Sequence, residues 1–131
     1  MASIKDLEMA AAISANNRIS IKKSLFGLRL SAQYEPTQSP LKVIVQAYAP
    51  ADGEKLLRLL DLPAEKLQSE LRKNGAPKPA PIGHFQLEAC LSEDHQFCAL
   101  QLFRFVDFKY SPASEFRCYE GAEAEIMAKL F

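Results

Sequence analysis

Four side chains of the types that bind zinc fall within fifteen residues of one another: His84, Cys90, His95 and Cys98. Two imidazoles and two thiolates are a legitimate tetrahedral zinc set, but this spacing matches no familiar zinc motif. The surrounding residues also predict a β-hairpin in which Cys90 and Cys98 point to opposite faces, so that the four ligands cannot converge. We therefore expect no metal and no cofactor, and interpret the two cysteines as buried structural residues.

A catalytic cysteine needs a neighbouring base, and the nearest such pair is His95 and Cys98, three positions apart. Residues three apart on a strand usually point to opposite faces. The nearby carboxylates, Glu93 and Asp94, are typical turn residues. The sequence also contains no glycine-rich phosphate loop, nucleophile elbow or dinucleotide-binding motif. It therefore predicts no catalytic residue and favours a non-enzymatic role, while leaving catalysis in a pocket open as an alternative.

Composition excludes several classes of protein. The chain has 131 residues, 48% of them hydrophobic, and a formal net charge of zero. This length suits one domain with its own core, and the neutral charge gives no support for a nucleic-acid partner. The sequence has no signal-peptide pattern and no run of eighteen apolar residues. Its three cysteines have no disulfide-like spacing. We expect a cytoplasmic protein that makes no membrane contact.

Apolar periodicity predicts the elements that position these residues. Helical spacing predicts helices at 3–15, 53–60, 63–73 and 122–131, and alternation predicts strands at 19–34 with a bend near Gly27, and at 41–49, 82–91, 97–110 and 116–119. Strands in meanders with grouped helices indicate an α+β fold. We expect an antiparallel sheet of about five strands with the helices mainly on one face. The Pro/Ala segment 76–81 is interpreted as a stiff crossing within a single domain, 1–131.

The segment 97–110 has no Gly or Pro and is rich in aromatic residues. We predict one long central strand here, paired with 82–91 through a two-residue turn at Glu93 and Asp94. This register places Leu87 opposite Leu100 and Leu91 opposite Gln96.

The sequence of this strand also suggests a binding surface. Alternation places Phe103, Phe105, Asp107 and Lys109 on the face opposite the expected core. The two phenylalanines exceed what the core face needs, so we predict that they contact a protein partner, or a second copy of the chain in a homodimer. The candidate binding residues are Phe103, Phe105, Lys109, Arg29 and Lys42.

Two alternatives remain open. Aromatic and basic residues interleave in 103–110, as on a strand that stacks single-stranded nucleic acid, with Arg29, Lys42, Lys22 and Lys23 as further contacts. A small-ligand or catalytic pocket between sheet and helices is the second alternative, and its candidate polar groups are His84, Glu88 and Arg104. Since Arg104 falls among core-facing residues, we expect it to be held by a carboxylate or by carbonyl groups. Replacing Arg104 with Ala should then cost about 3 kcal/mol if a buried partner is left behind.

Overall fold

The computed structural model describes residues 19–23 and 30–131. The predicted helix at 3–15, the bend near Gly27 and the candidate residue Arg29 lie outside this part. In chain order the elements are β1 (Ile19–Lys23), β2 (Leu30–Tyr34), β3 (Ser39–Tyr48), α2 (Pro50–Leu60), α3 (Ala64–Asn74), β4 (Phe85–Ser92), β5 (Phe97–Val106), β6 (Lys109–Pro112), β7 (Arg117–Glu120), α4 (Ala122–Met127) and the short 3-10 helix η1 (Ala128–Leu130).

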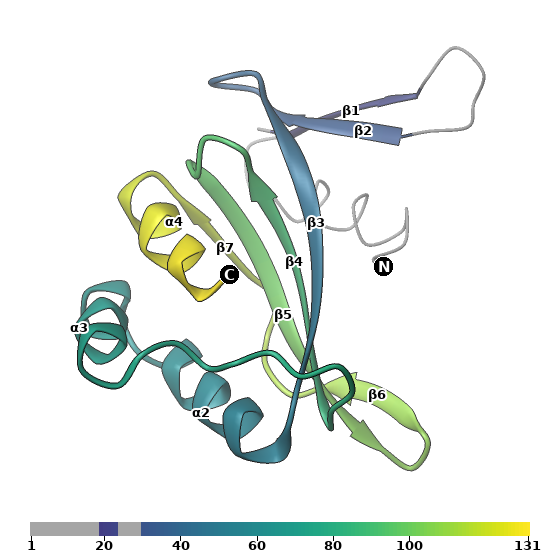
Figure 1. The fold of residues 1–131 in the computed structure, drawn as a ribbon. Coiled ribbons are helices and arrows are strands. Elements are labelled where there is room, and N and C mark those ends of the chain that lie inside the picture. Colours follow the sequence, from purple (N-terminus) through teal and green to yellow (C-terminus); the bar gives the residue numbers. More distant parts are fainter. Residues whose placement is uncertain (1–18, 24–29) are drawn as a thin grey trace.

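The described strands form one antiparallel sheet, and the α+β prediction is confirmed. Its order is β1-β2-β3-β4-β5-β6. The strand β7 pairs with the same edge of β5 as β6 does, but along its first half, 97–100, whereas β6 pairs with 103–106. The sheet has seven strands rather than about five, because the predicted strand at 97–110 divides in two and the first strand pair is separate. The helices α2, α3 and α4 lie on one side of the sheet, as predicted (Figure 1).

Large apolar residues of β4 and β5 pack against these helices. This main core includes Leu87, Leu102 and Cys98 from the sheet, and Leu56 and Met127 from the helices. A second cluster forms on the opposite face of the sheet, and it consists of Ile19, Ala32, Tyr34, Cys90, Phe97 and Ala99. The upper half of β5 is therefore buried on both faces. Cys90 and Cys98 lie in different clusters, which confirms that they point to opposite faces.

The predicted register between β4 and β5 is wrong by two residues. Leu87 faces Leu102 rather than Leu100, so the turn contains four residues instead of two. Because the shift is even, each side chain keeps its predicted face.

Local hydrogen bonds explain the longer turn. The hydroxyl oxygen of Ser92 accepts hydrogen bonds from the backbone N–H groups of Gln96 at 3.0 Å and Phe97 at 2.8 Å. His95 has a φ of 61°, a left-handed conformation that reverses the chain without a glycine.

The prediction of one continuous strand at 97–110 is also wrong. Asp107 and Phe108 have φ values of 52° and 63°, and two consecutive left-handed residues make a tight hairpin turn. The chain reverses after Val106 and returns as β6, which places Tyr110 directly opposite Phe105. Opposite residues of an antiparallel pair share a face, so Tyr110 lies beside Phe105 instead of behind it.

The Pro/Ala segment crosses the end of β3. The N–H of Ala80 donates to the carbonyl oxygen of Ala47 at 2.8 Å, and the N–H of Lys78 donates to a carboxylate oxygen of Asp52 at 3.2 Å. Asp52 therefore holds this crossing rather than capping α2, where Ala49 occupies the N-cap position without a side-chain bond. A Cβ atom on Gly83 would lie 1.9 Å from the carbonyl oxygen of Tyr48, so only glycine permits this approach. The single-domain organisation remains a prediction.

Two turns at one end of the sheet are joined by the carboxylate of Asp94. This carboxylate accepts hydrogen bonds from the hydroxyls of Thr37 and Ser92 and from the N–H of Gln96. The N–H of Asp94 donates to the hydroxyl oxygen of Ser39 at 3.0 Å. Desolvation alone would raise the pKa of Asp94, but these hydrogen bonds outweigh it and lower the pKa. The ionised carboxylate thus helps to hold the β2–β3 turn against the β4–β5 turn.

Asp94→Asn should lower the free energy of unfolding by about 1 kcal/mol at neutral pH, because the bonds to the charged oxygen weaken. A carboxylate with a lowered folded-state pKa stabilises the protein above its unfolded pKa, and loses this contribution as the pH falls through the folded-state value. Urea denaturation should therefore show the difference from the unsubstituted protein shrinking below about pH 4. Glu93→Gln is the control, since its side chain makes none of these bonds. A difference that is independent of pH would contradict this role.

Candidate functional site

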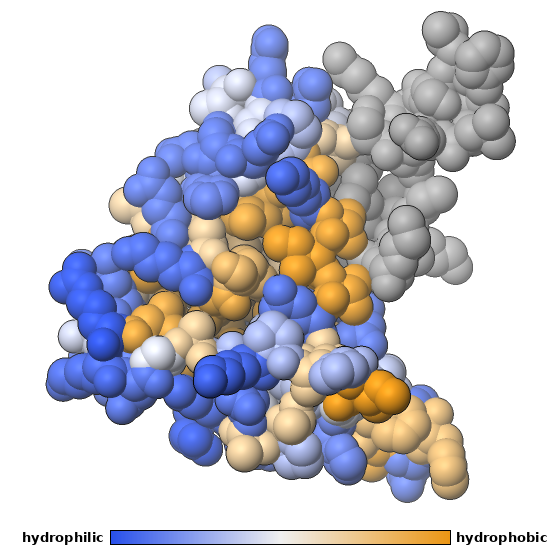
Figure 2. Space-filling view, in the orientation of Figure 1, coloured by the Kyte–Doolittle hydropathy of each residue, from blue (hydrophilic) through white to orange (hydrophobic). Residues whose placement is uncertain are grey.

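Most of the large apolar side chains that the described residues expose gather around the β5–β6 hairpin. Five of the six are Ile82, Phe105, Val106, Phe108 and Tyr110, and the sixth is Val43 on β3. We call these five residues the hairpin surface. Figure 2 shows apolar colours over this projecting part of the molecule at lower right. Phe105 and Tyr110 share one face of the hairpin, whereas Val106 lies on the other face. Exposed apolar groups gathered in one region are typical of interaction sites.

Ring packing and one hydrogen bond join the parts of the hairpin surface. The rings of Phe105 and Tyr110 have centroids 5.1 Å apart and are tilted by 60°. The Tyr110 hydroxyl donates to the carbonyl oxygen of Gly83 at 3.3 Å, next to Ile82 in the chain. The N–H of Phe105 donates to the carbonyl oxygen of His84 at 2.7 Å. The hairpin is thereby tied to the segment that precedes β4.

Phe108 combines full exposure with an unfavourable backbone conformation. Its side chain is 97% exposed at the tip of the hairpin. Its φ of 63° lies in the left-handed region, which costs a residue other than glycine or asparagine about 1 to 2 kcal/mol. Glycine is the residue that this turn position favours. The phenylalanine therefore serves neither the turn nor the core, and such a residue is a candidate for a functional role.

The structure separates the predicted binding residues. Phe105 is 41% exposed, whereas Phe103 is only partly exposed and faces Pro112. Lys109 pairs with Val106, so the prediction that it shares a face with Phe105 is wrong, because the chain reverses at the Asp107–Phe108 turn.

The other basic candidates do not join this surface. Lys42 is exposed on β3, and it pairs with Leu91 of β4. Its side chain lies on the face of the sheet that the helices cover, toward the end of the sheet that is far from Phe103. Arg29 lies outside the described residues. Lys42 and Lys109 therefore do not form a basic groove beside the Phe105 and Tyr110 rings, of the kind that single-stranded nucleic acid requires.

The three predicted pocket residues do not form a pocket together. His84 is exposed before the start of β4, and Glu88 is half-buried at the middle of β4. Arg104 pairs with Glu54 of α2 at 2.9 Å and lies 5.1 Å from the centroid of the Phe85 ring. The expected carboxylate partner is present, but the pair is exposed, with 42% and 48% of the two side chains accessible to solvent. The prediction that Arg104 is buried is thus wrong.

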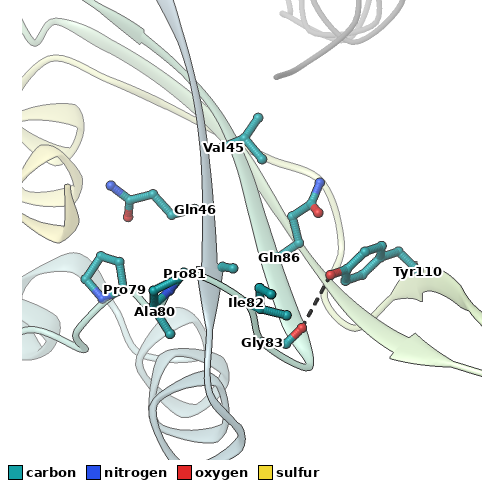
Figure 3. A pocket seen from close by; sticks show the side chains of 10 residues that line it. Val45, Gln46, Pro79, Ala80, Pro81, Ile82, Gly83, Gln86 and Tyr110 are labelled. Atoms are coloured by element: carbon teal, nitrogen blue, oxygen red, sulfur yellow. Dashed lines mark hydrogen bonds between the residues drawn. The ribbon is translucent and has the colours of Figure 1, made fainter.

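A pocket of about 440 Å³ lies where the Pro/Ala segment wraps the edge of β3. Its lining is mostly apolar and consists of Val45, Gln46, Ala47, Pro79, Ala80, Pro81, Ile82, Gly83, Gln86 and Tyr110. In Figure 3, Val45 and Gln86 lie on one side of β3, and Gln46 lies on the other. Two members of the hairpin surface, Ile82 and Tyr110, also line the pocket, so the two features are continuous.

The cysteines carry raised pKa values. Burial, together with the neighbouring Cys118, raises the pKa of Cys90 to about 12. Burial also raises the pKa of Cys98, with smaller contributions from Cys90 and Cys118. Cys118 is exposed. Partial desolvation, and to a smaller extent the charge of Glu120, raises the pKa of its thiol. A raised pKa disfavours the thiolate form that a nucleophilic cysteine needs.

Two kinds of site are absent from residues 19–23 and 30–131. No group of three or more His, Cys, Asp and Glu side chains in this part is placed to hold a metal ion. No helix there has the length and apolar character needed to cross a bilayer.

Comparisons with known proteins do not assign the chain to a family. No protein-family model matches it, and neither a curated protein nor a solved structure matches it significantly. Functional inference therefore depends on the hairpin surface and the adjoining pocket. Sequence reasoning missed Ile82, Phe108 and Tyr110. Asp107, which tolerates left-handed backbone, was the available signal for the turn that exposes Phe108.

Arg104→Ala should lower the free energy of unfolding by only about 1 kcal/mol, because an exposed ion pair and one cation–π contact are lost. Chemical denaturation measures this value. Glu54→Ala, combined with Arg104→Ala in a double-mutant cycle, isolates the ion pair. A loss near 3 kcal/mol would indicate a buried charge pair instead.

The thiols should react in order of their exposure. At mildly alkaline pH, iodoacetamide should modify Cys118 slowly and leave Cys90 and Cys98 unmodified, because thiolates are the reactive form and burial suppresses them. Mass spectrometry before and after unfolding in denaturant should show one and then three modified cysteines. Rapid modification of Cys90 in the folded protein would contradict its buried position.

Proposed function

We propose that this protein is a non-catalytic protein-binding module that acts through the hairpin surface, either on a partner protein or on a second copy of the chain. The main support for this proposal is that Phe108 is almost fully exposed and has a left-handed backbone conformation. A residue that lowers the stability of a turn, and buries nothing in the fold, is most simply explained by contact with another molecule.

The composition of the hairpin surface supports a protein partner. Aromatic residues are enriched at the centres of protein interfaces, where they supply large contact areas at low entropic cost. Phe105, Phe108 and Tyr110 are all aromatic, Ile82 adds exposed apolar area, and Val106 adds more on the opposite face of the hairpin. Lys109 and Asp107 beside them carry opposite charges, which gives the surface a polar rim without a strong field.

A cytoplasmic location is part of this proposal. Its support is that Cys90, Cys98 and Cys118 are all free thiols, as expected in a reducing compartment.

Phe108→Gly separates binding from stability. Glycine adopts the left-handed backbone without cost, so the substitution should raise the free energy of unfolding, by about 1 kcal/mol. The same substitution should weaken association roughly thirtyfold, if Phe108 is a central interface residue. Sedimentation velocity over a range of concentrations measures self-association, and denaturation measures stability.

Gln38→Gly is the matched control. Gln38 is also an exposed turn residue with a positive φ, 55°, so glycine should stabilise this turn as well, without changing association.

A photo-crosslinking amino acid at position 108, compared with one at position 38, identifies the partner in cells. Crosslinks to a second copy or to another protein that form only from position 108 are expected. The proposal fails if the chain remains monomeric and position 108 yields no crosslink beyond those from position 38.

A further inference from the structure

One edge of β3 pairs with β4, and the other edge faces away from β4. Among the described residues, this outer edge is covered only at its two ends. β2 pairs with β3 at Ser39 and Pro40, and the Ala80 bridge lies at Ala47. Between them, 41–46 has no backbone pairing partner on this outer edge among residues 19–23 and 30–131, although its other edge pairs with β4. This stretch spans about 20 Å of extended chain.

Hydrogen-bond parity shows which groups line that edge. The carbonyl oxygen of Pro40 accepts from Glu93 on the β4 side at 2.9 Å, and the carbonyl oxygen of Ala47 accepts from Ala80 on the outer side at 2.8 Å. In an antiparallel strand, successive residues direct their N–H and C=O groups to alternate sides. Val43 and Val45 therefore direct both groups outward, as Ala47 does. Figure 2 shows apolar residues along the middle of β3.

The pocket adjoins this edge at Val45. A strand added along the edge would have one residue directly opposite Val45, and its side chain would lie on the same face as that of Val45. Val45 and Gln86 line the pocket from that face, and Tyr110 and Ile82 also line it. The pocket is open to solvent and has a volume of about 440 Å³ shared between the two sides of β3, and its mostly apolar lining suits an apolar side chain.

We infer that the β3 edge binds an extended segment of a partner protein as an added antiparallel strand. The segment runs in the same direction as the Ala80 segment and covers about six residues. The residue opposite Val45 is large and apolar and occupies the pocket, and the residue opposite Val43 is also apolar. The residue opposite Lys42 is acidic, because Lys42 is exposed and is the only charged residue of β3.

The contacts at the two ends of stretch 41–46 favour a peptide over a second copy of β3 as the added strand. In a second copy of the chain, Ser39 and Pro40 already pair with β2 on the same edge that would have to pair with the first copy. Two-fold pairing centred on Ile44 would also bring Leu41 of that copy opposite Ala47, where Ala80 already lies. A short extended segment without flanking strands meets neither obstacle.

This inference rests on the proposed protein-binding function and names the chemistry of the partner segment. The hairpin surface and the pocket beside the β3 edge share Tyr110 and Ile82, so one partner can contact both. Phe108, however, does not line the pocket. Association through Phe108 and peptide binding at β3 are therefore separate measurements, and each can fail without the other.

A blocked six-residue peptide tests the inference against the full chain. It carries phenylalanine second, valine fourth and glutamate fifth, with threonine elsewhere, so that these residues meet Val45, Val43 and Lys42. Isothermal titration calorimetry should show saturable binding. N-methylation of the second residue removes an N–H that faces β3, and should weaken binding roughly tenfold. N-methylation of the third residue, whose N–H points away, is the matched control and should have less than about a twofold effect.

A charge exchange tests the register. Lys42→Glu should weaken binding of the glutamate peptide about two- to fivefold and restore binding of the peptide with lysine at that position. The proposal is overturned if the full chain shows no saturable binding, if the two N-methylated peptides lose affinity equally, or if the exchange restores nothing. If the peptide fails while Phe108→Gly still reduces association, only the β3 inference is lost.

Discussion

The antiparallel pairing of β4 with β5 is the interaction on which the other elements depend. Along this ladder, Leu87 and Leu102 face the helices, while Cys90 and Ala99 face the second cluster. Two independent apolar surfaces are thus created by a single pair of strands. The helices cover one, and β1 and β2 cover the upper part of the other (Figure 1). Burial on both faces gives this register its specificity, since a one-residue slip would reverse every side chain.

The lower part of the sheet departs from this pattern, and the candidate sites lie there. After Leu102 the side chains of β5 become progressively more exposed, and the Asp107–Phe108 turn ends the strand. The fold accepts a left-handed phenylalanine at this turn and close backbone contact at Gly83. Both features shape the region around the pocket, while the main core lies elsewhere. Unfavourable local geometry combined with exposed apolar area is the pattern expected at a binding site.

The two proposed binding features use different physical interactions. The hairpin surface offers apolar and aromatic area, which favours affinity but specifies little about the partner's backbone. The β3 edge offers directed N–H and C=O groups, which specify an extended conformation, and its pocket selects a side chain. An exposed edge also carries a risk of aggregation. The Ala80 bridge and the β2 contact shorten the accessible stretch of β3, and Lys42 adds a charge to it.

Alternation and helical spacing in the sequence determined the fold class, the positions of most elements and the opposite orientation of Cys90 and Cys98. They also identified Phe105 as a surface residue. Tertiary structure decided the rest. The Ser92 hydroxyl sets a four-residue turn that periodicity cannot detect, because an even shift preserves the pattern of faces. The reversal at Phe108 moves Tyr110 beside Phe105, and the pocket requires segments far apart in sequence to meet. Such contacts depend on long-range packing, which the local alternation of side chains does not encode.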